Sequence, residues 1–592
     1  MAETRTRQWR EAAAIAAVLL IAAVLRLWRL EDNGFGTAYY AAGVRSMLQG
    51  AWLFFYNSFD PAGFISLDKP PIAFWIQTAF AAVLGYSGWT IHLPQALAGI
   101  ASVGLLYRLV RQPFGVAAGL SAALLLAVMP VAVAVDRSNN TDSWLVFFLL
   151  LAATAALRGR GLSLVAAMAL LGVAFNVKML AALICGPALL AGWWFAGTLD
   201  WRRRLAWMAA AGVTLAVVSL AWAVAFDLTP KDSRPYAGSS HDNSMLELIV
   251  VHNGLGRFVR APRTPPTPPP AQAQTPRFEA YDAVPVGPLR LAAPALAAQF
   301  AWTLPLAVLG AVFGWRRRRA SVALWGTWAL TYGIVFSAAG GIFHAYYLAA
   351  LAPPLAALAG IGCFELWRRG PGHLALGLAA TALWQGYIAG ASLAWDATWM
   401  GFPVVALLAS AATVWRAKRP PAVIGGVALL ILPCLWALST LFAPGNLTLP
   451  SSSLARWLGR DDGRGPLLSR TYGALTNDPK LQAFLQEHRG EARFLLAAPN
   501  ALLAAPVIIQ SGQPVMAFGG FFGTDAVLSV DAFAKQVELG EVRFVVLGNT
   551  RRQGDFEHWV QAHGTPVDPG LWRSRPTEPR RSIVLYDLAA AK

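Results

Sequence analysis

The stretch FFYNSFDPAGFISLDKPPIAFW, residues 54–75, guides the interpretation of the whole chain. It places two carboxylates, Asp60 and Asp68, and the ammonium of Lys69 among aromatic residues and prolines. Apolar runs lie on both sides of it, so these charges stand beside segments that avoid water. Ionisable groups in such surroundings are costly and persist mainly where they line a cavity or a substrate path. The stretch therefore predicts a polar site at the edge of an apolar domain.

The composition places most of the chain in lipid. Of its 592 residues 56% are hydrophobic and 13% are charged, whereas a typical soluble protein has about 25% charged residues. The formal net charge of +17 would by itself fit a nucleic-acid-binding protein. The basic residues instead form short clusters between apolar runs, such as 202–204, 316–319 and 416–419. This is the positive-inside pattern of a membrane protein, so no nucleic-acid partner is expected.

Segments of about 20 apolar residues predict membrane-spanning helices. A count that admits some shorter segments gives about 13 of them. They lie near residues 12–27, 92–110, 114–134, 143–157, 162–176, 179–196, 205–226, 293–314, 320–338, 346–366, 372–394, 401–416 and 421–443. With a cytoplasmic N-terminus, alternate crossings put every strongly basic loop inside. We therefore expect a multi-pass α-helical protein of the bacterial inner membrane.

The same topology divides the chain into two domains. Residues 1–443 form the transmembrane domain, with outer loops at 30–91 and 227–292, and residues 444–592 form an extracytoplasmic domain. The proline-rich run 260–276 of the second loop predicts a flexible or polyproline-like segment. In the C-terminal region, short apolar runs at 493–496, 506–509 and 542–547 alternate with helical patterns at 478–486 and 530–537. This alternation predicts a small soluble α/β domain.

Glycines also mark one loop of the C-terminal domain. Gly519, Gly520 and Gly523 follow the run 513–518. They predict a turn, and a loop that approaches a phosphate is the alternative.

Four polar sets converge on the predicted outer face. They are Asp60, Asp68 and Lys69 of the first loop, the hairpin tip VDRSNNTDSW at 135–144, the run FNVKM at 175–179, and FHAYY at 343–347. Lysine and arginine can neutralise a phosphate, and a carboxylate can deprotonate an acceptor group. Simpler interpretations remain open: an exposed ion pair at 68–69, and a capped helix start at 137–142. Because all four sets fall on one side, a polar active site roofed by loops is favoured.

Several ordered motifs give the chain a family resemblance. They are YYAAGVRSM (39–47), FDPAGFISLDKPP (59–71), PQALAGIASVGLLYRLVR (94–111), VDRSNNTDSWL (135–145), FNVKM (175–179), HAYYLAALAPPLAAL (344–358) and PVMAFGGFFGTD (514–525). With these motifs the chain resembles the GT-C glycosyltransferases that use a polyprenyl-phosphate sugar. It is most similar to a bacterial mannosyltransferase branch of the protein mannosyltransferase and aminoarabinose transferase superfamily. The resemblance implies a GT-C fold and inverting transfer of a sugar to a cell-envelope glycan, lipid or protein.

The resemblance also implies roles for individual residues. Because Asp68-Lys69-Pro70-Pro71 is similar to the E-K-P-P motif of the aminoarabinose branch, Lys69 is expected to contact the donor phosphate. Further phosphate contacts are expected from Arg137, Lys178, Tyr346 and His344. Substrate contacts are expected from Tyr39, Tyr40, Asn139, Asn140 and Asp142.

One departure from the family pattern concerns the catalytic base. The acidic pair that supplies this base in the family corresponds here to Gly36 and Thr37. The role of base is therefore assigned to Asp68, Asp60 or Asp136, with the two aspartates of the first loop preferred.

The sequence also bounds cofactors and alternative functions. The three cysteines lie in apolar runs without zinc-type spacing, and no obligatory cofactor is expected, although the carboxylates could bind a divalent metal. A lipid-linked sugar transporter is one alternative, which the absence of polar residues at the middle of the spans disfavours. A catalytically silent binding or assembly subunit is the other, motivated by the missing acidic pair.

Overall fold

The computed structural model describes residues 2–252, 284–341, 343–460, 476–548, 554–575 and 583–589. Contacts divide the chain into two compact units. Unit 1 comprises Met1–Asn33, His92–Ser219 and Arg257–Gly465, and unit 2 comprises Gly34–Ile91, Leu220–Gly256 and Pro466–Lys592. The unit with the C-terminal region therefore also contains parts of both predicted outer loops. The proline-rich run 260–276 lies outside the described residues.

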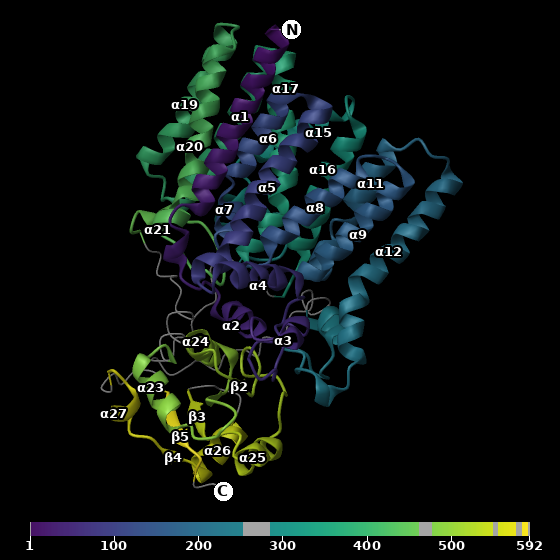
Figure 1. Ribbon diagram of the computed structural model, residues 1–592. Coiled ribbons are helices and arrows are strands. Elements are labelled where there is room, and N and C mark those ends of the chain that lie inside the picture. The colour runs from purple at the N-terminus through teal and green to yellow at the C-terminus, as the bar shows by residue number, and fades with distance from the viewer. Residues whose placement is uncertain are drawn as a thin grey trace. The chain divides into compact units, whose positions relative to one another are not determined.

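Unit 1 is built from apolar helices, several of which lie side by side in Figure 1, for example α19 and α20. The helices of this part of the chain are α1 (Ala2–Leu27), η1 (Leu30–Asn33), α5 (Gly88–Phe114), α6 (Val116–Ala127), α7 (Pro130–Asp136), α8 (Asp142–Ala156), α9 (Gly161–Lys178), α10 (Leu180–Leu183), α11 (Gly186–Ala196), α12 (Trp201–Leu228), η5 (Arg290–Ala292), α14 (Pro294–Phe300), α15 (Leu304–Trp315), α16 (Arg319–Ala338), η6 (Ala345–Leu351), α17 (Ala352–Arg369), α18 (Pro371–Ser392), α19 (Ala397–Trp415), α20 (Pro420–Phe442) and α21 (Leu454–Trp457).

Most of the predicted spans are present as helices. Within the described residues, nine helices are long and apolar enough to cross a membrane, or eleven if each of two bent pairs forms one span. The bent pairs are α6 with α7 and α14 with α15, each with a 60° angle between its helices. Proline stands in the first turn of α7 and of α15, where it suits a helix start but cannot continue the preceding helix.

Two predicted spans correspond to a short helix and to a broken one. The segments 143–157 and 179–196 correspond to α8, which has 15 residues, and to α10 with α11, which the turn at Ile184 and Cys185 separates. Because a helix rises 1.5 Å per residue, neither segment reaches the ~20 residues of a full span. Apolar composition had merged a broken helix into one predicted span.

Unit 2 contains a five-stranded mixed sheet with the order β2-β1-β3-β5-β4. Its strands are β1 (Leu496–Ala498), β2 (Val515–Ala517), β3 (Phe544–Leu547), β4 (Thr565–Pro566) and β5 (Val584–Asp587). Strand β1 is parallel to β2 and β3, and β5 runs antiparallel to β3 and β4. The remaining helices of unit 2 are α2 (Ala38–Met47), α3 (Ala51–Phe55), α4 (Ile72–Leu84), η2 (Lys231–Ser233), α13 (Met245–Glu247), η3 (Leu248–His252), α23 (Pro479–His488), α24 (Ala501–Ser511), α25 (Val530–Glu538), α26 (Gly554–His563) and α27 (Pro569–Trp572).

Alternate residues of the strands build two cores. Leu496 and Ala498 of β1 pack with α24 on one face, in a cluster that also includes α2. Ala497 of the same strand packs with Phe533 of α25 and Val560 of α26 on the other face. The helices therefore cover both sides of the sheet, as Figure 1 shows, and the predicted α/β character of the C-terminal region is confirmed.

One C-terminal element differs from its prediction. The run 506–509 lies inside helix α24 and not in a strand. The side chain of Asn500 accepts a hydrogen bond from the Leu503 N–H and so caps this helix, and Gly512 ends it in the left-handed conformation. These end signals outweigh the short apolar run, which does not by itself distinguish a buried strand from a buried helix.

The loop from Asn57 to Lys69 in unit 2 is folded around the side chain of Asp60. Its Oδ1 accepts a hydrogen bond from the Ala62 N–H at 2.9 Å. Its Oδ2 accepts from the N–H groups of Phe64 and Ile65 at 2.9 and 3.1 Å. Asp60 is fully buried, and burial raises its pKa to about 6, although the three N–H bonds oppose that rise. Asp60 therefore holds the loop that carries Asp68 and Lys69.

Replacing Asp60 with Ala should loosen this loop. Three backbone N–H groups would lose their acceptor, and buried unsatisfied donors cost about 1–3 kcal/mol each. We expect the free energy of local opening at residues 57–69 to fall by about 3 kcal/mol, measured by hydrogen exchange. Asp232→Ala, at an exposed position of the same unit, is the control. Unchanged protection in Asp60→Ala would contradict this role.

The same carboxyl should make stability depend on pH. Its pKa of about 6 lies above the value of about 3.9 expected in the unfolded chain. The associated stabilisation is complete below pH ~4 and is lost as the pH rises through ~6, amounting to about 3 kcal/mol. Thermal melting in detergent between pH 4 and 7.5 should show this loss in the wild type, and Asp60→Asn should remove that part of the pH dependence. Identical profiles for the two proteins would rule the assignment out.

Candidate active site

The most developed polar cluster of unit 1 surrounds Lys178. Its ammonium donates to Asp142 Oδ2 at 2.5 Å. The same nitrogen lies 4.7 Å from the ring centre of Tyr346 and 4.6 Å from that of Tyr347, within the range of cation–π attraction. His344 stacks on Tyr346 with 5.3 Å between ring centres. One cation is thus held between a carboxylate and two aromatic faces.

The positions of helix ends create this cluster. Asp142 is the first residue of α8, and Lys178 is the last residue of α9. The next residue, Met179, has φ 45° and ψ −134°, which is a strained conformation for a residue with a side chain. It breaks the chain direction directly after the lysine. The tyrosines come from η6, so three separate segments supply the cluster.

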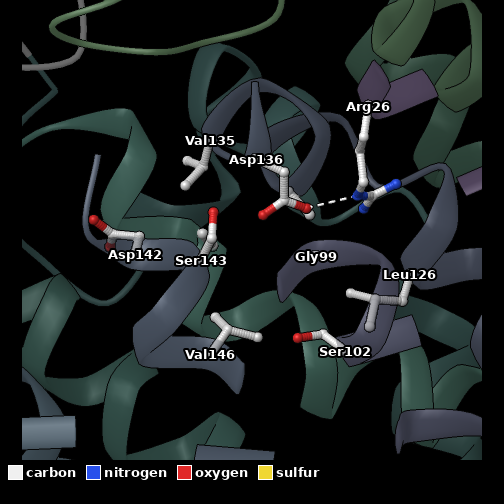
Figure 2. A pocket seen from close by; sticks show the side chains of 11 residues that line it. Arg26, Gly99, Ser102, Leu126, Val135, Asp136, Asp142, Ser143 and Val146 are labelled. Carbon is white, nitrogen blue, oxygen red and sulfur yellow. Dashed lines mark hydrogen bonds and ion pairs between the residues drawn. The ribbon is translucent and has the colours of Figure 1, made fainter. Parts of the chain in front are cut away.

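A second ion pair lies just before Asp142 in the chain, at the other end of the turn that joins α7 to α8. Asp136 ends α7, and its Oδ2 accepts from Arg26 Nε of α1 at 2.7 Å. Figure 2 shows this pair beside Ser102 and Ser143, which line a small cavity with it. In the same view the carboxylate of Asp142 turns away from Asp136. Arg26 is fully buried, so this arginine has its partner inside unit 1.

Arg137 lies between these two carboxylates in sequence but has a different environment. Its guanidinium donates to the carbonyl oxygens of Leu25, Arg26, Trp28 and Arg29 at 2.7 to 3.3 Å. These are carbonyls around the end of α1, which have no partners within the helix. Arg137 therefore caps α1, and its predicted contact with a phosphate stays a prediction.

The two asparagines of the turn are also inside the fold. Asn139 and Asn140 are buried, and Asn140 Oδ1 accepts from the Thr141 N–H at 2.8 Å. Thr141 occupies the N-cap position of α8, but its side chain makes no capping bond there. Substrate contact by the asparagines likewise stays a prediction.

Unit 2 carries the other predicted residues. Lys69 Nζ donates to Asp68 Oδ2 at 2.6 Å, and both side chains are nearly buried. Asp68 Oδ1 is buried and has no hydrogen-bond partner in the described part of the chain. The hydroxyl of Tyr39 accepts from the Asp68 N–H at 3.2 Å and donates to Ser66 O at 3.4 Å. Burial, and next the nearby Asp68 carboxylate, raise the pKa of Tyr39, so its phenol stays protonated.

Sequence reasoning missed Asp525 of the glycine-rich turn. Its Oδ2 accepts from the Ser239 N–H at 2.9 Å, which joins the second loop to the C-terminal domain. The ring of Phe521, from the same turn, lies 4.6 Å from that of Tyr39. Burial chiefly raises the pKa of Asp525, and the Asp68 carboxylate adds to this rise. The terminal motif PVMAFGGFFGTD was noticed in the sequence, but nothing there linked it to the first loop.

The structure therefore groups the predicted residues into two clusters. The cluster in unit 1 consists of Lys178, Asp142, Tyr346 and His344. Next to it in the chain, Asp136 pairs with Arg26 and Arg137 caps α1. Asp68, Lys69 and Tyr39 come together in unit 2, where Tyr40 packs against Phe74. Asp60 has both carboxylate oxygens engaged by backbone N–H groups. In the described residues, no three His, Cys, Asp or Glu side chains are grouped so that they could hold a metal ion.

Family models match two parts of the chain. Residues 68–222 match the model described as "Dolichyl-phosphate-mannose-protein mannosyltransferase". Residues 481–563 match the model described as "Putative mannosyltransferase YkcB-like, C-terminal". The two matched regions contain Asp68, Lys69, Asp142 and Lys178 of the clusters, and most of the sheet.

Comparison with known proteins covers nearly the whole chain. The Bacillus subtilis (strain 168) protein named "Putative mannosyltransferase YycA" is 33% identical, over 94% of each chain. A second protein from the same organism, "Putative mannosyltransferase YkcB", is 32% identical over 94% of this chain and 92% of its own. The crystal structure of ArnT from Cupriavidus metallidurans bound to undecaprenyl phosphate aligns with a TM-score of 0.56 over 99% of this chain and 98% of that chain. At 18% sequence identity, this structural likeness shows a shared fold.

These findings confirm the predicted family, the helical membrane fold and the class of enzyme. The chain is a multi-pass membrane protein, and it belongs to the GT-C family of glycosyltransferases, with the two mannosyltransferase-like proteins of Bacillus subtilis among its relatives.

Proposed function

We propose that this enzyme moves a sugar from a polyprenyl-phosphate carrier to a cell-envelope glycan, lipid or protein on the outer face of a bacterial inner membrane. The observation that carries the proposal is the Lys178 ammonium, which is only 10% exposed and lies among Asp142, Tyr346 and Tyr347. A cation in an apolar helical unit can neutralise a lipid-linked phosphate and marks a substrate path. The ArnT structure, which contains undecaprenyl phosphate, supports a carrier of this kind. The basic loops support a cytoplasmic N-terminus and an outer active site.

The proposed reaction is a direct displacement with inversion. An acceptor hydroxyl or amine attacks the anomeric carbon, and the bond from that carbon to the phosphate oxygen breaks. The electron pair leaves with the polyprenyl phosphate, and the acceptor proton passes to a carboxylate. Lys178 stabilises the charge that develops on the departing phosphate. Lys69 is proposed as a cation that contacts the donor phosphate, as its match to the E-K-P-P motif implies.

Asp68 is the carboxylate we propose as the base. Its Oδ1 is buried without a hydrogen-bond partner in the described chain, so one oxygen remains available for an acceptor proton. Asp60 has no such oxygen, because both accept backbone N–H bonds. Asp136 is paired at Oδ2 with Arg26, as Asp68 is with Lys69, and Asp68 is preferred to it because Asp68 belongs to the stretch that matches the E-K-P-P motif. We further propose that the reaction needs no obligatory metal, because cations of the protein stabilise the leaving phosphate.

Lys178→Ala should remove donor binding and transfer together. Loss of one positioned cation typically costs about 100-fold or more in transfer rate. The measurement is transfer of radiolabelled sugar from polyprenyl-phosphate mannose or glucose in membranes, compared at equal enzyme levels. The control is Glu365→Gln, which removes another buried carboxylate from an ion pair, with Arg369, elsewhere in unit 1. Unaltered transfer by Lys178→Ala would overturn the assignment of the phosphate site.

Asp68→Asn should lower the transfer rate with little effect on donor binding. General-base catalysis contributes about 10²–10⁴-fold, so a loss of at least about 100-fold is expected. Binding of the donor is measured separately by competition with undecaprenyl phosphate in detergent. Asp60→Asn, which keeps one carbonyl acceptor for the loop, should retain more activity than Asp68→Asn. The reverse order would transfer the role of base to Asp60.

A further inference from the structure

The carboxylate of Asp142 is the counter-ion of the Lys178 ammonium. The distance from its Nζ to Asp142 Oδ2 is 2.5 Å, and the side chains are 10% and 1% exposed. Water therefore screens this pair very little, and its electrostatic interaction is stronger than that of a surface pair. Any phosphate that binds Lys178 must compete with this carboxylate.

The position of Asp142 is fixed by the packing around it. It is the first residue of α8, its neighbours Thr141 and Ser143 are buried, and α8 packs along α9. The rings of Tyr346 and Tyr347 occupy other sides of the ammonium. A phosphate on Lys178 is therefore bound beside a carboxylate that is held in place and almost inaccessible to solvent. The negative charge of Asp142 acts on every anion at this place.

The donor and the product of the proposed reaction differ in charge. The donor is a phosphodiester with one negative charge. The product is a phosphomonoester, whose second pKa near 6 gives it between one and two negative charges at pH 7. A lone lysine would hold the more highly charged product more tightly than the donor. Tight binding of product would slow turnover, since product release limits many enzymes.

We propose that Asp142 is a product-release residue, whose fixed negative charge at Lys178 repels the dianionic polyprenyl phosphate more than the monoanionic donor. This inference rests on the proposed function, because it takes Lys178 as the donor-phosphate site. Like charges held close together in a poorly screened place disfavour each other. Asp142 therefore acts through the lysine and the phosphate, and it does not accept the acceptor proton.

The first test measures binding of undecaprenyl phosphate to the full-length protein in detergent at pH 8. Asp142→Asn keeps an oxygen that can accept from Lys178 but removes the charge. It should bind this product at least about tenfold more tightly than the wild type, with lower kcat and stronger product inhibition. Asp142→Glu, which restores the charge, should return affinity toward the wild-type value. Glu365→Gln should leave affinity unchanged.

The outcomes separate the two proposals. If Lys178→Ala abolishes binding but Asp142→Asn binds no more tightly than the wild type, the release role fails and the phosphate site stands. If Lys178→Ala binds undecaprenyl phosphate as well as the wild type, the phosphate site itself fails. A purely structural role for Asp142 would weaken binding in Asp142→Asn, which also counts against the inference.

A second test needs only the wild type and applies even if the variants do not fold. Affinities for undecaprenyl phosphate and for its methyl diester are compared at pH 5 and pH 8. The diester stays monoanionic, so it reports any titration of the protein's own groups. In the described part of the chain, the titratable and charged groups around the ion pair are Asp136 with its partner Arg26, Tyr332, His344, Tyr346 and Tyr347. The ratio of the two affinities therefore isolates the second charge of the monoester.

The inference gives this ratio a definite direction. Binding of the monoester relative to the diester should weaken at least about threefold from pH 5 to pH 8, as the second proton is lost. A monoester that gains affinity relative to the diester over this range would show that Lys178 dominates and would overturn the inference.

Discussion

Two buried ion pairs at the ends of one short turn organise unit 1. The turn runs from Asp136, the last residue of α7, to Asp142, the first residue of α8. One carboxylate pairs with Arg26 of α1 and the other with Lys178 of α9. Removing one partner of a buried pair leaves a charge without compensation, which typically costs about 3–5 kcal/mol. The pairing therefore fixes four helices relative to one another and explains how a run of polar residues persists between apolar segments.

Within the same turn, Arg137 has a structural role, whereas Asp142 belongs to the candidate phosphate site. The guanidinium of Arg137 donates hydrogen bonds to the carbonyl groups around the end of α1. Asp142, five residues later, pairs with Lys178, whose ammonium also lies against the rings of Tyr346 and Tyr347. Sequence adjacency made Arg137 and Asp142 look like members of one site. In the structure their side chains have different surroundings, because each side chain's direction depends on where α7 ends and α8 begins.

The sequence predicted the spans better than the contacts between them. Hydropathy locates a helix because each residue contributes to burial in lipid locally. It could not show that 179–196 is a broken helix, because the break, at Ile184 and Cys185, is a matter of backbone conformation and not of composition. It also gave no sign of the partner of Arg26, since that partner lies 110 residues away in the chain. Pairings at such separations depend on the packed fold, which a single sequence does not display.

A further limit of the sequence concerns Gly36 and Thr37, which stand where the family has an acidic pair. Gly36 has φ 61°, in the left-handed region that glycine adopts without strain, and Thr37 is buried before α2. The chain thus uses these positions to turn into α2. Among the carboxylates of the first loop, Asp60 is satisfied by backbone donors, while Asp68 keeps a buried oxygen without a partner in the described chain. A buried polar atom of this kind is expensive unless a ligand or water uses it. That cost is the physical argument for giving Asp68 the role that the sequence alone left divided among three aspartates.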